Sequence, residues 1–136
     1  MALTADVLYN RRGQPGRNEF GYPLAPGEIV YRGSLVAVNA SGQLQRIQTS
    51  GSVAFVGMAD RQLSNVGNAS ALSTPPVTAL KGTWGIAVPS ATAANINATV
   101  YATDDNTLTL TAGSNLAVGS LVGIENGLTY VQFTGS

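Results

Sequence analysis

The sequence contains neither cysteine nor histidine, and it has few charged side chains. Without cysteine no disulfide can form, so the stability of the fold must come from packing. The absence of both residue types also excludes the Ser-His-Asp and Cys-His nucleophile systems and almost every zinc site. We therefore expect a protein that is not an enzyme and that needs no cofactor.

Charged residues make up 10% of the chain, with seven basic and seven acidic side chains and a formal net charge of zero. A typical soluble protein has about 25% charged residues, so much of this surface must consist of Ser, Thr, Asn, Gln and small apolar groups. Such a surface repels itself only weakly, which favours a homo-oligomer over the alternative of an adhesive monomer. A neutral chain also gives no reason to expect nucleic-acid binding by counterion release.

Long apolar runs are missing as well. No segment approaches the roughly 20 apolar residues that a membrane-spanning helix needs, and residues 1–10 lack the basic start and apolar centre of a signal peptide. We expect no membrane association, and we expect synthesis in the cytoplasm. The length of 136 residues fits one domain that can bury a core of its own.

Strand signals dominate the part of the sequence between residues 83 and 133. Asn126 and Gly127 form the preferred pair for a two-residue type I′ hairpin turn, and this turn places Ile124 opposite Thr129. The same register predicts that Tyr130 covers Gly123 on one face. It predicts one buried face, made of Val122, Ile124, Val131 and Phe133.

Further strands are predicted earlier in the chain. Residues 29–38 are rich in β-formers and are interrupted at Gly33, and the turn residues 39–42 lead back into a second strand with Leu44 and Ile47 inward. The uncharged run 53–59 predicts a strand that is buried on both faces. Residues 60–76 have the composition of a surface loop that leads into a strand at 77–81.

Three shorter elements are expected in the second half. Residues 90–97 are alanine-rich and predict one or two helical turns with Ser90 as the N-cap. The alternation of Leu and Thr over 107–112 predicts a strand with one buried face. Asp104 and Asp105 lie in a predicted turn with Asn106, and a calcium site made of these oxygens is the alternative.

The N-terminal 27 residues differ from the rest because glycine and proline are dense there, which excludes a long helix or an inner strand. We expect residues 1–27 to form an extended arm and residues 28–136 to form the β domain. The predicted fold is mainly β, a small β-barrel or β-sandwich with this arm and at most one short helix.

Large aromatic side chains and arginines make the predicted arm adhesive. The candidate contacts with a neighbouring subunit or a partner are Tyr9, Arg11, Arg12, Arg17, Phe20 and Tyr22. These arginines suit carboxylates on an acidic protein surface, and stacking on single-stranded nucleic acid is the less favoured alternative. The arm could equally fold back over its own domain. Trp84, the single tryptophan, is a candidate core or interface anchor.

Several segments resemble the capsid cement, or head decoration, proteins of tailed bacteriophages. The first are Pro-Gly-Glu-Ile-Val-Tyr-Arg-Gly-Ser-Leu-Val-Ala-Val at 26–38 and Phe-Val-Gly-Met-Ala at 55–59. The likeness continues through Thr-Trp-Gly-Ile-Ala at 83–87, Ala-Thr-Val-Tyr-Ala-Thr-Asp-Asp at 98–105, Val-Gly at 118–119 and Tyr-Val-Gln-Phe at 130–133. Its specificity lies in the order of these segments.

The resemblance implies a structural virion protein that binds the outer surface of a phage capsid and stabilises it. The implied partners are the major capsid protein and further copies of this chain, with a homotrimer as the expected assembly. The implied location is the outer capsid surface, after synthesis in the host bacterial cytoplasm. The alternative function is that of a receptor- or glycan-binding β module of a phage fibre or adhesin, which the low charge and the Thr- and Asn-rich surface would also suit.

Overall fold

The computed structural model describes residues 19–133, and nearly all regular elements in this range are β-strands. The strands are β1 (Gly21–Leu24), β2 (Ile29–Val30), β3 (Leu35–Val38), β4 (Leu44–Arg46), β5 (Ala54–Ala59), β6 (Leu63–Ser64), β7 (Leu72–Leu80), β8 (Gly82–Gly85), β9 (Thr99–Ala102), β10 (Leu108–Thr109), β11 (Leu116–Glu125) and β12 (Leu128–Phe133). One 3-10 helix, η1 (Ala93–Asn95), lies between β8 and β9. The predicted mainly β fold with at most one short helix is therefore confirmed.

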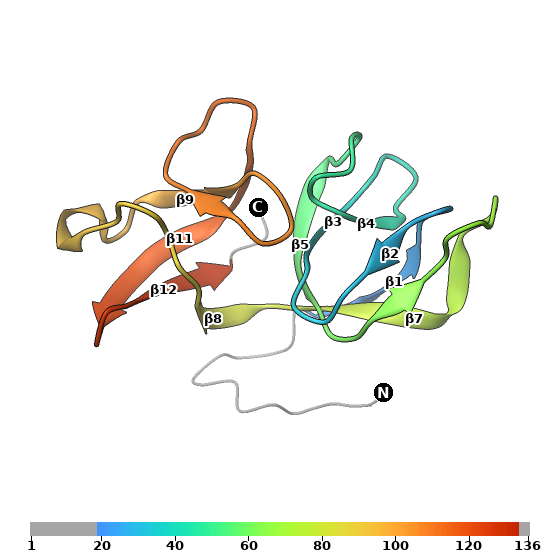
Figure 1. Ribbon diagram of the computed structural model, residues 1–136, viewed down its shortest axis with the longest axis horizontal. Coiled ribbons are helices and arrows are strands. Elements are labelled where there is room, and N and C mark those ends of the chain that lie inside the picture. Colours follow the sequence, from blue (N-terminus) through green and yellow to red (C-terminus); the bar gives the residue numbers. More distant parts are fainter. Residues whose placement is uncertain (1–18, 134–136) are drawn as a thin grey trace.

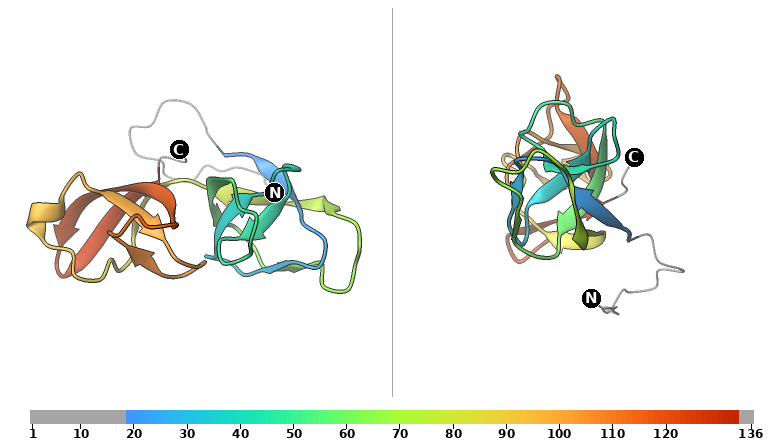
Figure 2. Two further views of the ribbon diagram at one scale, coloured as in Figure 1. Left: turned by 90° about the horizontal axis from the view of Figure 1, so that it is seen from above. Right: turned by 90° about the vertical axis from the view of Figure 1, so that its right-hand side faces the viewer.

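The strands form two main sheets that lie side by side (Figure 1). The first is a closed barrel with the order β1-β4-β3-β5-β7, and the second is a five-stranded sheet with the order β10-β9-β11-β12-β8. A small third sheet pairs β2 with β6. Strands β7 and β8 follow each other almost without interruption, and Figure 2 shows that they connect the barrel half to the five-stranded half. The prediction of a small barrel is thus confirmed for the first half.

The predicted hairpin in the barrel is also confirmed. Strands β3 and β4 are antiparallel, and Asn39 Oδ1 accepts hydrogen bonds from the backbone N–H groups of Ser41 and Gln43. This is the local bonding that makes asparagine favourable at turns. Leu44 and Ile47 point inward as expected, and most of β5 is buried.

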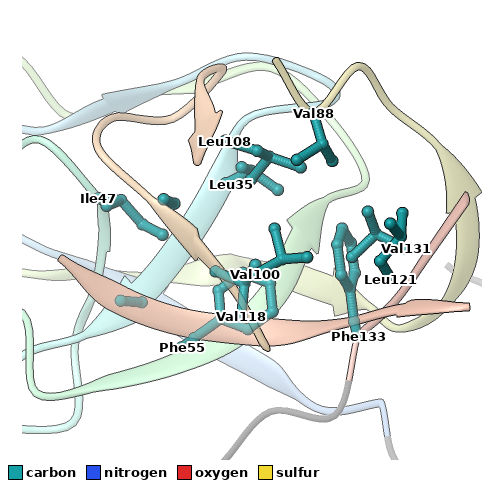
Figure 3. Close-up of a cluster of buried hydrophobic side chains, with 12 residues drawn as sticks. Leu35, Ile47, Phe55, Val88, Val100, Leu108, Val118, Leu121, Val131 and Phe133 are labelled. Atoms are coloured by element: carbon teal, nitrogen blue, oxygen red, sulfur yellow. The ribbon is translucent and has the colours of Figure 1, made fainter. Parts of the chain in front are cut away.

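One apolar cluster is shared by both sheets (Figure 3). Leu35, Ile47 and Phe55 come from the barrel half, and they meet side chains from the strands and loops of the five-stranded half. The rings of Phe55 and Phe133 contact each other edge to face, with centroids 5.1 Å apart and an interplanar angle of 83°. Because aromatic pairs favour this arrangement, the contact helps to join the two halves. A second cluster fills the barrel itself.

The C-terminal hairpin follows the predicted register only near its turn. Asn126 and Gly127 both have positive φ, 54° and 79°, and Ile124 lies opposite Thr129. A β-bulge at Val122 then shifts the pairing by one residue, so that Leu121 lies opposite Val131. Extra residues in bulges cannot be read from alternation.

The bulge changes which side chains are buried. Val131 and Phe133 are buried as predicted, and Leu121 joins them at 0% exposure. The predicted burial of Val122 and Ile124 is wrong, because these side chains are 38% and 37% exposed.

Tyr130 covers a different glycine from the predicted one. A Cβ built at Gly85 would lie 3.3 Å from Tyr130 Cε1, whereas a Cβ at Gly123 would meet nothing within 4 Å. Gly123 and Gly85 are the two cross-strand neighbours of Tyr130. The ring of Tyr130 therefore leans toward β8.

The predicted boundary between arm and domain at residue 27 is wrong for the described residues. β1 is a strand of the closed barrel, paired with β4 and β7, and Leu24 and Ala25 are buried. Pro23 lies within β1 at the point where the pairing with β7 is irregular, which is a place where a strand tolerates proline. Of the predicted arm, residues 1–18 lie outside the described residues.

Three other predicted elements have different limits. β7 already begins at Leu72, inside the predicted loop, and the predicted strand over 107–112 is reduced to β10. Strand β10 ends because Thr109 Oγ1 accepts a hydrogen bond from Thr111 N, which turns the chain. The short helix is capped by Thr92 and not by Ser90, since Thr92 Oγ1 accepts from a backbone N–H of the first turn.

Candidate interaction surfaces

The predicted contact residues fall into three groups. Tyr9, Arg11, Arg12 and Arg17 lie outside the described residues. Phe20 is 61% exposed just before β1, as a contact residue should be. Tyr22 belongs to β1 and therefore to the barrel.

Tyr22 is held by the barrel and is only partly exposed. It lies opposite Val77 of β7 and packs against the barrel cluster. Burial raises the pKa of its phenol above the usual value. Tyr22 therefore belongs to the barrel and not to an extended arm, and its role as a contact residue stays a prediction.

Trp84 lies in β8 opposite Val131 and packs against the apolar cluster that both sheets share. Its position is that of a core anchor, one of the two roles predicted for it. Its indole Nε1 is buried and has no acceptor among residues 19–133. A buried N–H without a partner is uncommon, so the surroundings of this side chain are incomplete within the described range.

Exposed apolar side chains gather at the far end of the five-stranded half. The hydrogen bond from Asn97 N to Leu121 O, 2.7 Å long, places the end of η1 beside β11. Figure 2 shows η1 and the tip of the β11–β12 hairpin at the same end of the molecule. We give this end of the molecule the name hairpin-end patch, and its exposed members are Ile96, Val122, Ile124 and Leu128. The register places Ile124, opposite Thr129, and Leu128, opposite Glu125, on the two opposite faces of the hairpin. Sequence reasoning missed it because alternation predicted Val122 and Ile124 to be buried, whereas Val122 lies in the bulge and Ile124 lies next to the turn, where both are exposed.

The barrel half carries the other exposed large apolar side chains, and it also contains a buried carboxylate. Glu28 is 6% exposed, and it accepts hydrogen bonds from Thr49 Oγ1 at 2.6 Å, from Ile29 N at 2.9 Å and from Arg46 N at 3.1 Å. Arg46 Nε also donates to Glu28 Oε1 at 3.1 Å. The carboxylate thereby fastens the chain before β2 to the end of β4.

Burial alone would raise the pKa of Glu28. The hydrogen bonds from Thr49, Ile29 and Arg46, together with the charge of Arg46, outweigh burial and hold the pKa below its usual value. No short-range motif could have found this group, because Arg46 and Thr49 are 18 and 21 residues away in the sequence. Its role is structural, since all of its partners belong to the fold.

Two buried side-chain amides, of Asn65 and Gln45, also hold neighbouring loops through hydrogen bonds. Asn65 Nδ2 donates to the carbonyl oxygens of Leu24, Ala25 and Ser70, at 3.3, 3.0 and 2.9 Å. Gln45 Nε2 donates to three oxygens of the loop that follows β4. These side chains replace backbone pairing where the chain is irregular.

The predicted turn at Asp104 and Asp105 is confirmed, and it joins the two halves. Asp105 Oδ2 accepts from Ser34 Oγ at 2.9 Å, its carbonyl accepts from Leu35 N at 2.9 Å, and its N–H donates to the side chain of Gln48. Asp104 accepts from its own turn. Within residues 19–133 no group of three or more acidic side chains is placed to hold a metal ion.

Comparison with known proteins adds no relative. No protein-family model, no curated protein and no solved structure matches the chain. In the part of the chain that the structure describes, no helix is long and apolar enough to cross a membrane.

Proposed function

We propose that this protein is a structural virion protein that binds the outer surface of a bacteriophage capsid and stabilises it, without catalysing a reaction. The segments that resemble capsid cement proteins lie in β2, β3, β5, β8, β9, β11 and β12. They therefore supply strands to both main sheets and most of the shared core. The resemblance lies in segments that build the fold, so it does not locate the contact surface.

The hairpin-end patch is the observation that carries the proposal. Its four apolar side chains are 37% to 50% exposed, on a chain in which only 10% of residues are charged. Exposed apolar groups that gather at one end of a monomer mark a protein–protein contact. A decoration protein needs two such contacts, one with the major capsid protein and one with further copies of itself, here a homotrimer.

Residues upstream of β1 supply the second candidate contact. Phe20 is the most exposed aromatic residue of the described range, and Tyr9, Arg11, Arg12 and Arg17 precede it. Together they offer aromatic area and positive charge to an acidic capsid surface.

Co-sedimentation with expanded empty heads tests the proposal. The full chain should pellet with the heads and saturate at a fixed number of copies per capsid protein, and it should remain in the supernatant without heads. A double variant of the hairpin-end patch, Val122→Ser with Leu128→Ser, should bind more weakly, whereas Val66→Ser, which changes an exposed valine of the barrel half, should bind normally. Failure to pellet, combined with binding to host cells or to immobilised glycans, would replace the proposal by the receptor-binding alternative.

A further inference from the structure

Strand β8 has one open edge within the described residues. It is the last strand of its sheet and pairs only with β12. Ile86 N, just after β8, donates to Thr129 O on β12, so the even-numbered residues here turn their backbone groups toward β12. Since the backbone groups of successive strand residues point to opposite sides, those of Thr83 and Gly85 face the open edge.

The chain enters the described region at this same edge. Ala79 N donates to Phe20 O at 3.1 Å, and Lys81 N donates to Glu19 Oε2 at 3.3 Å. Strand β1 runs antiparallel to β7, and β8 prolongs β7. Residues that precede Glu19 therefore reach β8 if β1 continues in its own direction.

The β1–β7 register, continued upstream, gives a pairing that fits the sequence. Gly21 lies opposite Thr78, and the pairs that would exchange backbone hydrogen bonds upstream are Asn18–Lys81, Gly16–Thr83 and Gln14–Gly85. Pro15 then falls opposite Trp84, where its nitrogen points away from β8. Edge strands tolerate proline at such positions, so no residue that must donate in this pairing is a proline.

The unpartnered indole of Trp84 lies at the same place. A Cβ built at Gly82 would lie 3.9 Å from Trp84 Nε1, which puts this nitrogen beside the β8 backbone. A buried N–H without an acceptor among residues 19–133 thus lies in the strand whose outer edge is open in the described range.

We propose that the outer edge of β8 is the docking site for residues 14–18 of the same chain, which add to it as an antiparallel strand that prolongs β1. The added strand covers an edge that would otherwise be a template for aggregation.

Disulfide trapping tests this pairing in the full chain, which has no cysteine of its own. The variant Gly16→Cys with Thr83→Cys places the two Cα atoms about 5.5 Å apart in the proposed register, within the range that a disulfide bridges. It should form an intramolecular disulfide under mild oxidation. The matched control, Gly16→Cys with Ala87→Cys, is four residues out of register and should stay reduced. Equal oxidation of both pairs, or of neither, would overturn the proposal.

Two further measurements keep the test decisive. Disulfide-linked dimers from a mixture of the two single-cysteine chains would show that a second copy supplies the strand, which also contradicts the proposal. Amide exchange provides a readout without cysteine, because Gly16→Pro removes a donor of the proposed pairing whereas Gly13→Pro falls where the nitrogen points away. Exchange at Thr83 and Gly85 should become about tenfold faster in the first variant and stay unchanged in the second.

Discussion

The two halves of the molecule are stabilised by different means. Within the range that the structure describes, the four buried polar or charged residues belong to the barrel half, and they bind backbone or loop groups. They are Glu28, Ser34, Gln45 and Asn65. The five-stranded half has a buried interior of apolar side chains and ends in the exposed hairpin-end patch. Irregular chain needs internal hydrogen-bond partners, whereas a long hairpin supplies its own.

This difference suggests that the two halves serve different purposes, one stabilising the fold and the other contacting partners. The loops of the barrel half are fixed by specific hydrogen bonds, so their residues serve the fold. The outer end of the five-stranded half contributes little to any core, and its apolar side chains remain available to a partner. Substitutions in the barrel half should therefore alter stability, whereas substitutions at the hairpin-end patch should alter association.

The largest loss of stability is expected from Val131→Asp. Val131 is fully buried between the two sheets, and an unpaired carboxylate there should lower the free energy of unfolding by about 3–5 kcal/mol. Urea denaturation measures the change. Gln132→Asp, one residue further on the exposed face, should be nearly neutral, and equal losses in the two variants would show that the faces of β12 are assigned incorrectly.

Asn65→Asp should have the next largest effect. The substitution would replace a donor to three carbonyl oxygens by a carboxylate oxygen, at a cost of about 2–4 kcal/mol. The matched control is Asn97→Asp, because Asn97 is exposed and bonds to the fold through its backbone N–H. If thermal denaturation gives the same melting temperature for both variants, the buried amide does not hold the barrel loops.

Glu28→Gln should cost about 1–3 kcal/mol at neutral pH, since it removes the charge that pairs with Arg46 and one hydrogen-bond acceptor. Asp60→Asn, at the more exposed pair with Arg61, should change the unfolding free energy by less than about 1 kcal/mol. Denaturation in urea at pH 7 compares the two.

The Glu28 effect should also depend on pH in a defined direction. The pKa of Glu28 in the folded state is lowered, below a value of about 4.3 in the unfolded chain. Its charge therefore adds stability above that pH, and this contribution is lost as the pH falls through the folded pKa. The stability curves of wild type and Glu28→Gln should converge in acid, and a constant difference down to pH 3 would contradict the assignment.

The smallest effect on stability is expected at the hairpin-end patch. Leu128→Ser should change the unfolding free energy by no more than about 0.5 kcal/mol, because the side chain is 50% exposed. It should nevertheless weaken self-association measured by sedimentation velocity, whereas Val66→Ser in the barrel half should not. A large loss of stability without a change in association would place Leu128 in the core.

Local chemistry explains why some features could be predicted from the sequence. The turn at Asn126 and Gly127 depends on two adjacent residues, and the burial of β5 depends on the short uncharged run 53–59. Both could therefore be predicted from the sequence. The bulge at Val122 and the hydrogen bonds around Glu28 depend on partners in distant parts of the chain, so neither leaves a local pattern in the sequence. The inclusion of Pro23 in a barrel strand was unpredictable for the same reason, because only tertiary pairing makes that position tolerable.

Electron cryo-microscopy of purified virions tests the central claim most directly. We expect density on the outer face of the capsid, in symmetric groups of copies, into which the barrel and the five-stranded sheet fit side by side. The hairpin-end patch should lie against the capsid or a neighbouring copy. Virions with a bare capsid surface and this protein located at the tail fibres, or absent from the particle, would contradict it.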